Sequence, residues 1–417
     1  MPALSKIFLS IALVVLAVDG APHNRNATAK ANSSKNSSAR GNVAKAVYLI
    51  TNDAQNSVIA LPIKESGKLS HGSVTQTGGK GSNSIDMNDN LPAAPDALVS
   101  QSALTISGES LFAVNAGSNT LTMFSIDPKD PTKLTALGQP AAIPGEFPST
   151  VAASAKNNMV CVGTTGAKAG VSCATFSSKG LGKMDALRPF DLGQTTPPVG
   201  PLNTVSQVFF SDDETTLFTT IKGNPRANNT GFLSSFPVTA ASGCRGAEAS
   251  LSTQETRSSP EGTAVLFGTK PIPGTTSLFA TDASFGAVVL GVNTAKQATV
   301  LGKGSIADQA ATCWVTINEV SKTAFVTDVG VNHVVEMSLE DASIISTTDL
   351  SANGDPGLID LASGGNFVYA LSPGNGTTKA AVTVMDVSGG KIKQVQHFKL
   401  NKKTTAGKNA QGMAVLL

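Results

Sequence analysis

Seven segments of the chain repeat one pattern, in which apolar and polar residues alternate on both sides of a short polar turn. In Ser110–Gly138, a predicted strand over Leu111–Asn115 and another over Thr120–Asp127 flank a turn at Ala116–Asn119. Such alternation predicts a β-hairpin. A single hairpin is only marginally stable in water, so we expect the seven hairpins to pack against one another.

The other six hairpins are predicted at residues 45–69, 159–184, 217–238, 278–301, 323–345 and 367–395. Alignment on the first strand of each hairpin places seven residues in register: Tyr48, Phe112, Val160, Phe218, Phe279, Phe325 and Val368. Their irregular spacing, about fifty residues on average, fits a four-stranded propeller blade with loops of variable length.

Short apolar segments before six of the hairpins predict the innermost strands of the blades: Ala103–Ser107, Thr150–Ser154, Gln207–Ser211, Thr263–Gly268, Thr312–Asn318 and Leu358–Ser363. The first hairpin has no such segment, but Gln411–Leu417 at the C-terminus has the same character. Joining this last strand to the first hairpin closes the ring and removes a free sheet edge. We therefore predict an all-β fold, a seven-bladed β-propeller of four-stranded blades over residues 45–417. A solenoid or a pair of β-sandwiches would leave both orphan strands unexplained.

Composition agrees with short strands and turns, since the 417 residues include 40 Gly and 21 Pro and only 14% are charged. The net charge of +2 gives no argument for a nucleic-acid partner. With one Trp and two Tyr, any stacking platform for a base or sugar would have to use Phe.

The N-terminus predicts export from the cell. Lys6 precedes the apolar run Ile7–Ala17, and small residues follow at Val18–Ala21, which is typical of a signal peptide over residues 1–20. Residues 21–44 form a basic Asn- and Ser-rich segment without acids, for which we predict a disordered tail. No other stretch is long enough to predict a membrane span. We expect a secreted monomer, extracellular or in the cell wall.

Behind a signal peptide, the Asn-X-Ser/Thr sequons become predicted glycosylation sites. Five are present, at Asn26, Asn32, Asn36, Asn228 and Asn375.

Four cysteines in an oxidising compartment predict disulfides. Cys161 and Cys173 lie on the two arms of one hairpin, about equally far from its turn at Gly166–Lys168, so we predict a cross-strand bridge. Cys244 and Cys313 either pair or remain buried thiols; spacing does not choose between these alternatives.

Several blades carry motifs similar to those of one family: Val114–Thr120, Phe209–Glu214 with Leu217–Gly223, Cys313–Val315 with Phe325–Asp328, and Leu361–Tyr369. The chain from about Val43 to Leu417 resembles the lactonase-type seven-bladed propellers, which include 6-phosphogluconolactonase and the fungal carboxy-cis,cis-muconate cyclases. Among secreted members it looks most like fungal wall or culture-filtrate glycoproteins.

The resemblance implies a funnel near the ring axis, lined by His, Arg and Glu, that holds a carboxylated or phosphorylated lactone and moves a proton at carbon. Relatives often carry a His just before an inner strand, but here Gly145–Thr150 has none. Charged residues that could supply a general acid/base and a carboxylate clamp are Glu146, Arg188, Lys222, Arg226 and Arg245. The alternative for each is a solvated loop residue.

Three other polar motifs favour structural roles. Asp282 and Asp328 end equivalent strands in neighbouring blades, where we expect them to accept hydrogen bonds in tight turns. Asp86–Asn90 begins like a calcium loop, but Leu91 replaces the required Gly, so we predict a turn. Gly78–Ser82 is interpreted as a flexible connection. No cofactor or metal is predicted.

Two hypotheses about function follow. The first is a non-catalytic, glycosylated surface protein, adhesin- or antigen-like, that binds wall polysaccharide or host matrix protein. The second is an extracellular carboxymuconate cyclase or lactonase that acts on a small carboxylated lactone or its open form. The signal peptide, the basic tail, the scarcity of His and the missing family His favour the first hypothesis, which is our prediction. The resemblance along the whole chain supports the second as the alternative.

Overall fold

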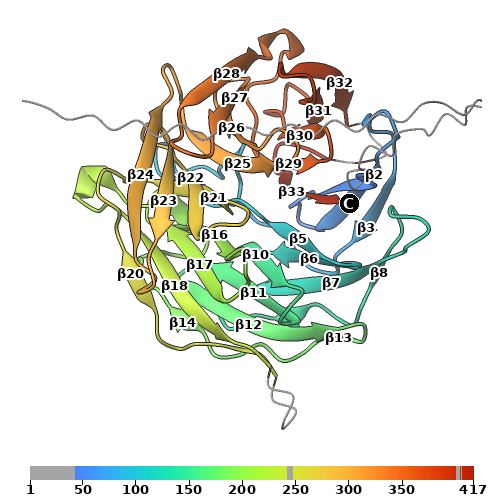
Figure 1. The fold of residues 1–417 in the computed structure, drawn as a ribbon. Coiled ribbons are helices and arrows are strands. Elements are labelled where there is room, and N and C mark those ends of the chain that lie inside the picture. The colour runs from blue at the N-terminus through green and yellow to red at the C-terminus, as the bar shows by residue number, and fades with distance from the viewer. Residues whose placement is uncertain (1–42, 242–247, 401–403, 405) are drawn as a thin grey trace, which may run out of the picture. The chain divides into compact units, whose positions relative to one another are not determined.

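The computed structural model describes residues 43–241, 248–400, 404 and 406–417. The predicted signal peptide, the part of the predicted tail with Asn26, Asn32 and Asn36, and also Cys244 and Arg245 lie outside the described residues. Seven antiparallel sheets follow one another around a ring, as predicted (Figure 1). No helix among the described residues is long and apolar enough to span a membrane.

Each blade has an innermost strand near the axis and a second strand beside it. The innermost strands are β33 (Gln411–Leu416), β5 (Leu104–Ser107), β10 (Pro148–Ser154), β16 (Val205–Phe210), β21 (Leu266–Pro271), β25 (Thr312–Asn318) and β29 (Leu361–Gly364). The second strands are β1 (Ala46–Ile50), β6 (Ser110–Asn115), β11 (Met159–Thr164), β17 (Thr216–Ile221), β22 (Ser277–Asp282), β26 (Thr323–Asp328) and β30 (Phe367–Ser372).

The outer half of each blade continues the same sheet. The third strands are β2 (Ser57–Pro62), β7 (Thr120–Ile126), β12 (Gly170–Ser177), β18 (Phe232–Thr239), β23 (Gly286–Val292), β27 (His333–Ser338) and β31 (Ala381–Asp386). The fourth strands are β3 (Ser73–Gln76), β8 (Leu134–Ala136), β13 (Gly180–Leu181), β19 (Ser250–Leu251), β24 (Ala298–Ser305), β28 (Ile344–Asp349) and β32 (Lys393–Lys399). Three short strands also pair with third strands: β9 (Ala141–Ala142), β14 (Arg188–Pro189) and β20 (Thr256–Ser258). Two 3-10 turns are also present, η1 (Pro225–Ala227) and η2 (Ser351–Asn353).

The two ends of the propeller meet in the first blade, as the orphan C-terminal strand predicts. Strand β33 pairs antiparallel with β1, and Tyr48 lies opposite Ala414. Strand β33 also contacts the innermost strands on either side, β29 and β5. The ring is therefore closed by hydrogen bonds between the chain's two ends.

The predicted alignment of second strands needs a correction of one residue in two blades. In the other five blades, the aligned aromatic residue is the third residue of the second strand. In β11 and β30, the aligned Val160 and Val368 are the second residue, and the third position is occupied by Cys161 and Tyr369. Tyr369 and Tyr48 each donate from Oη to a backbone carbonyl in an outer loop of the next blade, which confirms that these two are equivalent.

The inner strand of the fifth blade also begins later than predicted, at Leu266 rather than Thr263. Gly268 is a residue within the strand and not its end. A Cβ at Gly268 would lie 2.1 Å from Oε1 of Gln101. This glycine therefore makes room for a side chain at the ring centre.

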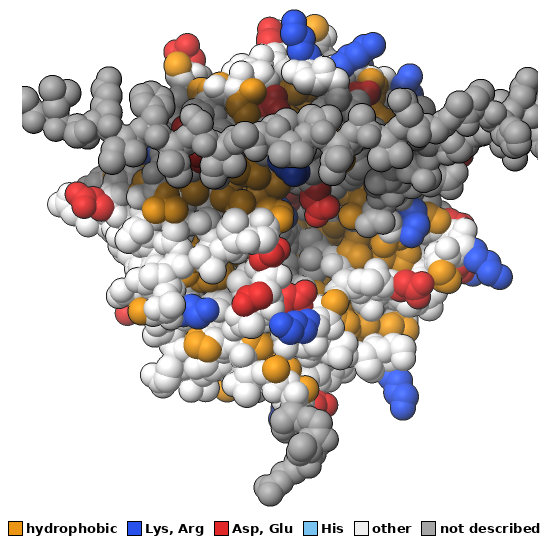
Figure 2. All heavy atoms as spheres, viewed as in Figure 1, with side chains coloured by type: hydrophobic (Ala, Val, Ile, Leu, Met, Phe, Trp, Pro, Cys, Tyr) orange, Lys and Arg blue, Asp and Glu red, His pale blue; other side chains and the backbone are white. Residues whose placement is uncertain are grey.

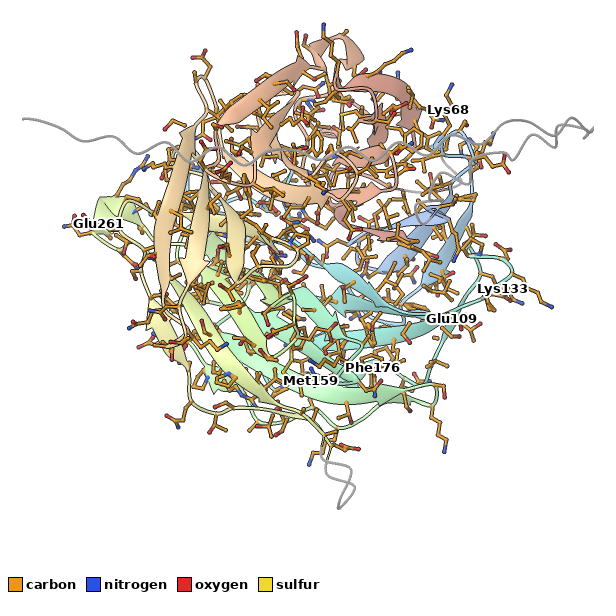
Figure 3. The ribbon with its side chains drawn as sticks, in the orientation of Figure 1. Lys68, Glu109, Lys133, Met159, Phe176 and Glu261 are labelled. Atoms are coloured by element: carbon orange, nitrogen blue, oxygen red, sulfur yellow. A yellow bond between two sulfur atoms is a disulfide. The ribbon has the colours of Figure 1, made fainter. Side chains whose placement is uncertain are left out.

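The hydrophobic core lies between neighbouring blades. Phe176 of β12, labelled in Figure 3, packs edge-on against Phe112 of the preceding blade, with ring centroids 4.9 Å apart. Phe267 and Trp314 make the same kind of contact between the fifth and sixth blades, at 5.0 Å. Full burial of such side chains contributes roughly 1.5–3 kcal/mol each.

The predicted disulfide is confirmed. Cys161 and Cys173 lie directly opposite each other on β11 and β12 and are joined by a disulfide bond. Cys313 is a buried free thiol, one of the two alternatives for this residue.

The long connection between the first two blades contains a short strand of its own. Within it, β4 (Ile85–Asp86) pairs parallel with β15 (Val199–Gly200), which lies in the loop after the third blade. Asp86 accepts from the backbone N–H of Asn88 at 2.8 Å, so the predicted turn is confirmed.

The glycine-rich part of this connection is not the flexible link that was expected. Gly81 donates its N–H to the carbonyl of Asp53 at 2.8 Å. A Cβ at Gly81 would lie 2.1 Å from the carbonyl oxygen of Asn52. Close packing against the first blade explains the glycine here.

Candidate functional site

Residues 94–102, which we call the axial segment, pass among the innermost strands before β5 begins. Every residue from Asp96 to Gln101 is buried. Asp96, Val99 and Ser102 have φ of 65°, 48° and 67°, a left-handed conformation that L-residues adopt at a cost of about 1 kcal/mol or more. Such strain persists only where surrounding contacts hold the backbone in place.

Side chains of the axial segment and of the ring bind each other's backbone. Gln101 donates from Nε2 to the carbonyl of Val315 at 2.8 Å and accepts from its N–H at 3.1 Å. Trp314 donates from Nε1 to the carbonyl of Ser100 at 3.2 Å. Gln207 of β16 donates to the hydroxyl of Ser102 at 3.2 Å. These contacts tie the segment to two blades.

Lys222 and Asp96 form the first pair of opposite charges at the ring centre. Lys222 is 1% exposed, donates from Nζ to the carbonyl of Val99 at 2.5 Å, and lies 4.4 Å from the ring centroid of Phe267. Burial lowers the pKa of Lys222 to about 8, against the opposing effect of the Asp96 charge. Burial raises the pKa of Asp96 to about 7, and its Oδ1 has no hydrogen-bond partner.

Asp360 and Lys270 form the second pair. Asp360 accepts from the N–H of Ser102 at 3.3 Å and from its neighbour Leu361 at 3.0 Å. Burial raises the pKa of Asp360 to about 7, although the Lys270 charge opposes the shift. Lys270 is half-buried, and burial lowers its pKa while Asp360 raises it.

Asp96, Lys222, Lys270 and Asp360 together are the axial cluster. A carboxyl group with a pKa near 7 can both take and return a proton at neutral pH. An ammonium group beside it can stabilise a developing negative charge on oxygen. Perturbed carboxyl and amine groups placed together are a common feature of functional sites.

Sequence reasoning named only Lys222 of the axial cluster. The other three members could have been found as charged residues inside apolar runs. Asp96 lies in Pro95–Ser100, Lys270 lies near the end of an inner strand, and Asp360 lies between Ile359 and Leu361.

Two other predicted residues lie in loops away from the axial cluster. Glu146 accepts from the hydroxyl of Thr196 at 2.6 Å and forms a salt bridge with the exposed Lys168 at 3.4 Å. Arg226 is exposed within η1. Neither residue contacts the axial cluster.

Arg188 is buried between the third and fourth blades. Its guanidinium donates to Asp185 at 2.9 Å and to the carbonyls of Leu251 and Ser252 at 2.7 and 2.6 Å. These bonds join β14 to the next blade, so the geometry indicates a structural role.

The predicted turn roles of two aspartates are confirmed. Asp282 accepts from the N–H of Ala264 at 2.7 Å, and Asp328 accepts from the N–H of Ala311 at 2.8 Å. Each carboxylate fixes the loop that leads into the inner strand of its own blade.

The sequons within the described residues, at Asn228 and Asn375, are both exposed. On the face shown in Figure 2, several acidic side chains gather near the middle beside one basic side chain, and the other basic side chains are scattered.

No family model and no curated protein matches this sequence. Solved structures match its fold. A periplasmic gluconolactonase, PpgL, of Pseudomonas aeruginosa aligns with a TM-score of 0.63 at 13% identity, over 89% of this chain and 99% of that chain. A putative 6-phosphogluconolactonase of Bacteroides fragilis gives 0.57 at 10% identity, over 90% and 98%. Another of Bacteroides uniformis gives 0.53 at 16% identity, over 69% and 80%. The chain thus has the fold of lactonase-like propellers.

Proposed function

We propose that this protein is an enzyme that acts on a small lactone or on its open, carboxylated form, and that the axial cluster supplies the reacting groups. The observation that carries the proposal is the pair of Asp96 and Lys222, whose pKa values are both shifted towards neutrality. The names of the gluconolactonases that share this fold support the choice of substrate class.

In hydrolysis, Asp96 as carboxylate takes a proton from water while the water oxygen bonds to the lactone carbonyl carbon. The Lys222 ammonium stabilises the resulting oxyanion. The bond from carbon to the ring oxygen then breaks, and the protonated Asp96 returns its proton to that oxygen. The product is the open hydroxy acid, and the same groups serve the reverse ring closure.

The side chains of the axial cluster differ in burial, and this difference sets the order in which a ligand contacts them. Lys270 is the half-buried member of the cluster, whereas Lys222 is 1% exposed and Asp96 is 9% exposed. A ligand carboxylate therefore contacts Lys270 before the more deeply buried Lys222 and Asp96.

The solved structures that share this fold give no support to the alternative of a non-catalytic surface protein. The cellular location predicted with that alternative remains part of the proposal. Residues 1–20 direct export, the mature protein is extracellular or in the cell wall, and the exposed sequons carry glycans. The periplasmic location named for the Pseudomonas relative is compatible with action outside the cytoplasm.

The test is turnover by the purified mature protein of glucono-δ-lactone, 6-phosphogluconolactone and carboxymuconate, followed by proton release and NMR. We expect turnover of at least one substrate above the buffer rate, with kcat/KM rising through a pKa near 7. If no substrate is turned over by folded protein, the proposal is wrong.

A further inference from the structure

A groove of about 880 Å³ lies between the fourth and fifth blades, and its lining includes Pro271, the residue after Lys270 in β21. Three turns border it: residues 211–215 between β16 and β17, residues 272–276 between β21 and β22, and residues 293–297 between β23 and β24. This volume is within the range of pockets that bind small molecules.

The floor of the groove is apolar and rigid. It contains the buried Phe218 and Leu278 and the half-buried Pro271 and Val292. Phe218 stacks on Phe209 with ring centroids 5.4 Å apart, which fixes its orientation. The hydroxyl of Thr216, also part of the lining, is buried without a hydrogen-bond partner.

The rim carries groups that both donate and accept hydrogen bonds. Thr276 and Thr294 are exposed, and within the described part of the chain their hydroxyls have no partner. Asp212 accepts from the N–H of Gly274 at 2.9 Å and so holds the turns of the two blades at a fixed separation.

Charges on the rim sum to one net negative charge, from Asp212, Asp213 and Lys296. The hydroxyl of Ser211 donates to Asp213 at 2.6 Å and holds the pKa of that carboxyl below its usual range. Lys296 interacts electrostatically with Asp213. With two acidic side chains and one lysine, the rim has no excess positive charge that could bind a phosphate or a polyanion.

We propose that this groove binds a short, uncharged oligosaccharide. A sugar ring presents an apolar face of C–H groups and an edge of hydroxyls, which matches an apolar floor below a rim of hydroxyls and carboxylates. A ligand hydroxyl could donate to Asp212, which already accepts from Gly274, and accept from Thr276 or Thr294. The proposed binding does not depend on lactone chemistry.

The test is direct binding to the full mature protein by calorimetry or saturation-transfer NMR. The probes are maltotriose, cellotriose and chitotriose, with tri-galacturonate as the anionic comparison. Thr294→Trp fills the groove from an exposed position. Thr347→Trp places the same bulk on the exposed β28 of another blade and serves as the control.

We expect saturable binding of at least one neutral trisaccharide, weakened more than about tenfold by T294W and unchanged by T347W. A milder variant, Thr276→Ala, should weaken the same binding without filling the groove. Failure of all three neutral probes, preference for tri-galacturonate, or equal binding by wild type and T294W would each overturn the proposal. Because the readout is binding, these outcomes are independent of any lactone turnover.

Discussion

Gln101 in the axial segment binds both backbone groups of Val315, donating at 2.8 Å and accepting at 3.1 Å. The side-chain amide thus satisfies part of the inner edge of β25 as another strand would. Because Gln101 precedes the second blade and Val315 belongs to the sixth, this pair joins opposite sides of the ring.

Replacing Gln101 by Ala should destabilise the propeller by about 2–4 kcal/mol, because a buried N–H and a buried carbonyl lose their partner. Urea unfolding measures the change, and Trp314, the single Trp, reports on the axial segment through its fluorescence. The control Gln254→Ala, at an exposed position, should change stability by less than about 0.5 kcal/mol. Equal stability of the two variants would contradict the account.

Stability should fall as pH rises from about 4 to about 7. Asp360 has a pKa of about 7 in the folded protein against 3.8 ordinarily, so the folded state binds more protons in this interval. Each such group contributes a slope of at most about 1.4 kcal/mol per pH unit. Asp360→Asn should reduce the slope in urea titrations at several pH values, while leaving Lys270 and Asp96 in place. An unchanged slope would show that Asp360 is not the titrating group.

Removing the disulfide with the double change Cys161→Ser and Cys173→Ser should cost about 2–3 kcal/mol. The bridge closes a loop with a sequence separation of 12, which limits the unfolded chain. Thermal unfolding with and without dithiothreitol measures the effect, since the reductant should lower the Tm of the wild type and not of the double variant. Sensitivity of both proteins to the reductant would contradict this assignment.

Deleting Gly412–Leu417 should abolish cooperative unfolding, because β1 loses its inner partner and an edge strand is exposed. Size-exclusion chromatography should then show aggregates. Deleting Leu417 alone, beyond the end of β33, is the control and should leave a monomeric, cooperatively folding protein. A truncated chain that melts like the full one would show that the ring does not need this closure.

Periodicity predicted the architecture because each blade repeats the same alternation, and seven weak signals reinforce one another. The cross-strand pair Cys161 and Cys173 was predictable for the same reason, since hairpin register is local. The alignment was wrong by one residue at Val160 and Val368 because these strands are continuous apolar runs. Neighbouring residues in such a run are all hydrophobic, and only the face of the sheet that each occupies tells them apart.

The candidate site was harder to predict because it is assembled from distant parts of the chain. Asp96 comes from the axial segment, whereas Lys222, Lys270 and Asp360 come from or adjoin the strands of three different blades. Nothing local marks Asp360 as a neighbour of Ser102; only the path of the axial segment brings them together. Glu146 and Arg226 carry charge in loops, which sequence reasoning cannot separate from charge at a site.

The most direct measurement is the initial rate of lactone hydrolysis, at constant pH, by the wild type and by Asp96→Asn, Lys222→Met and Glu146→Gln. Circular dichroism checks that each variant is folded. The account predicts that D96N and K222M each lose at least about a hundredfold in kcat/KM, as expected for removal of a general base or an oxyanion partner, and that E146Q retains wild-type activity. Wild-type rates in folded D96N and K222M, or a loss confined to E146Q, would contradict it.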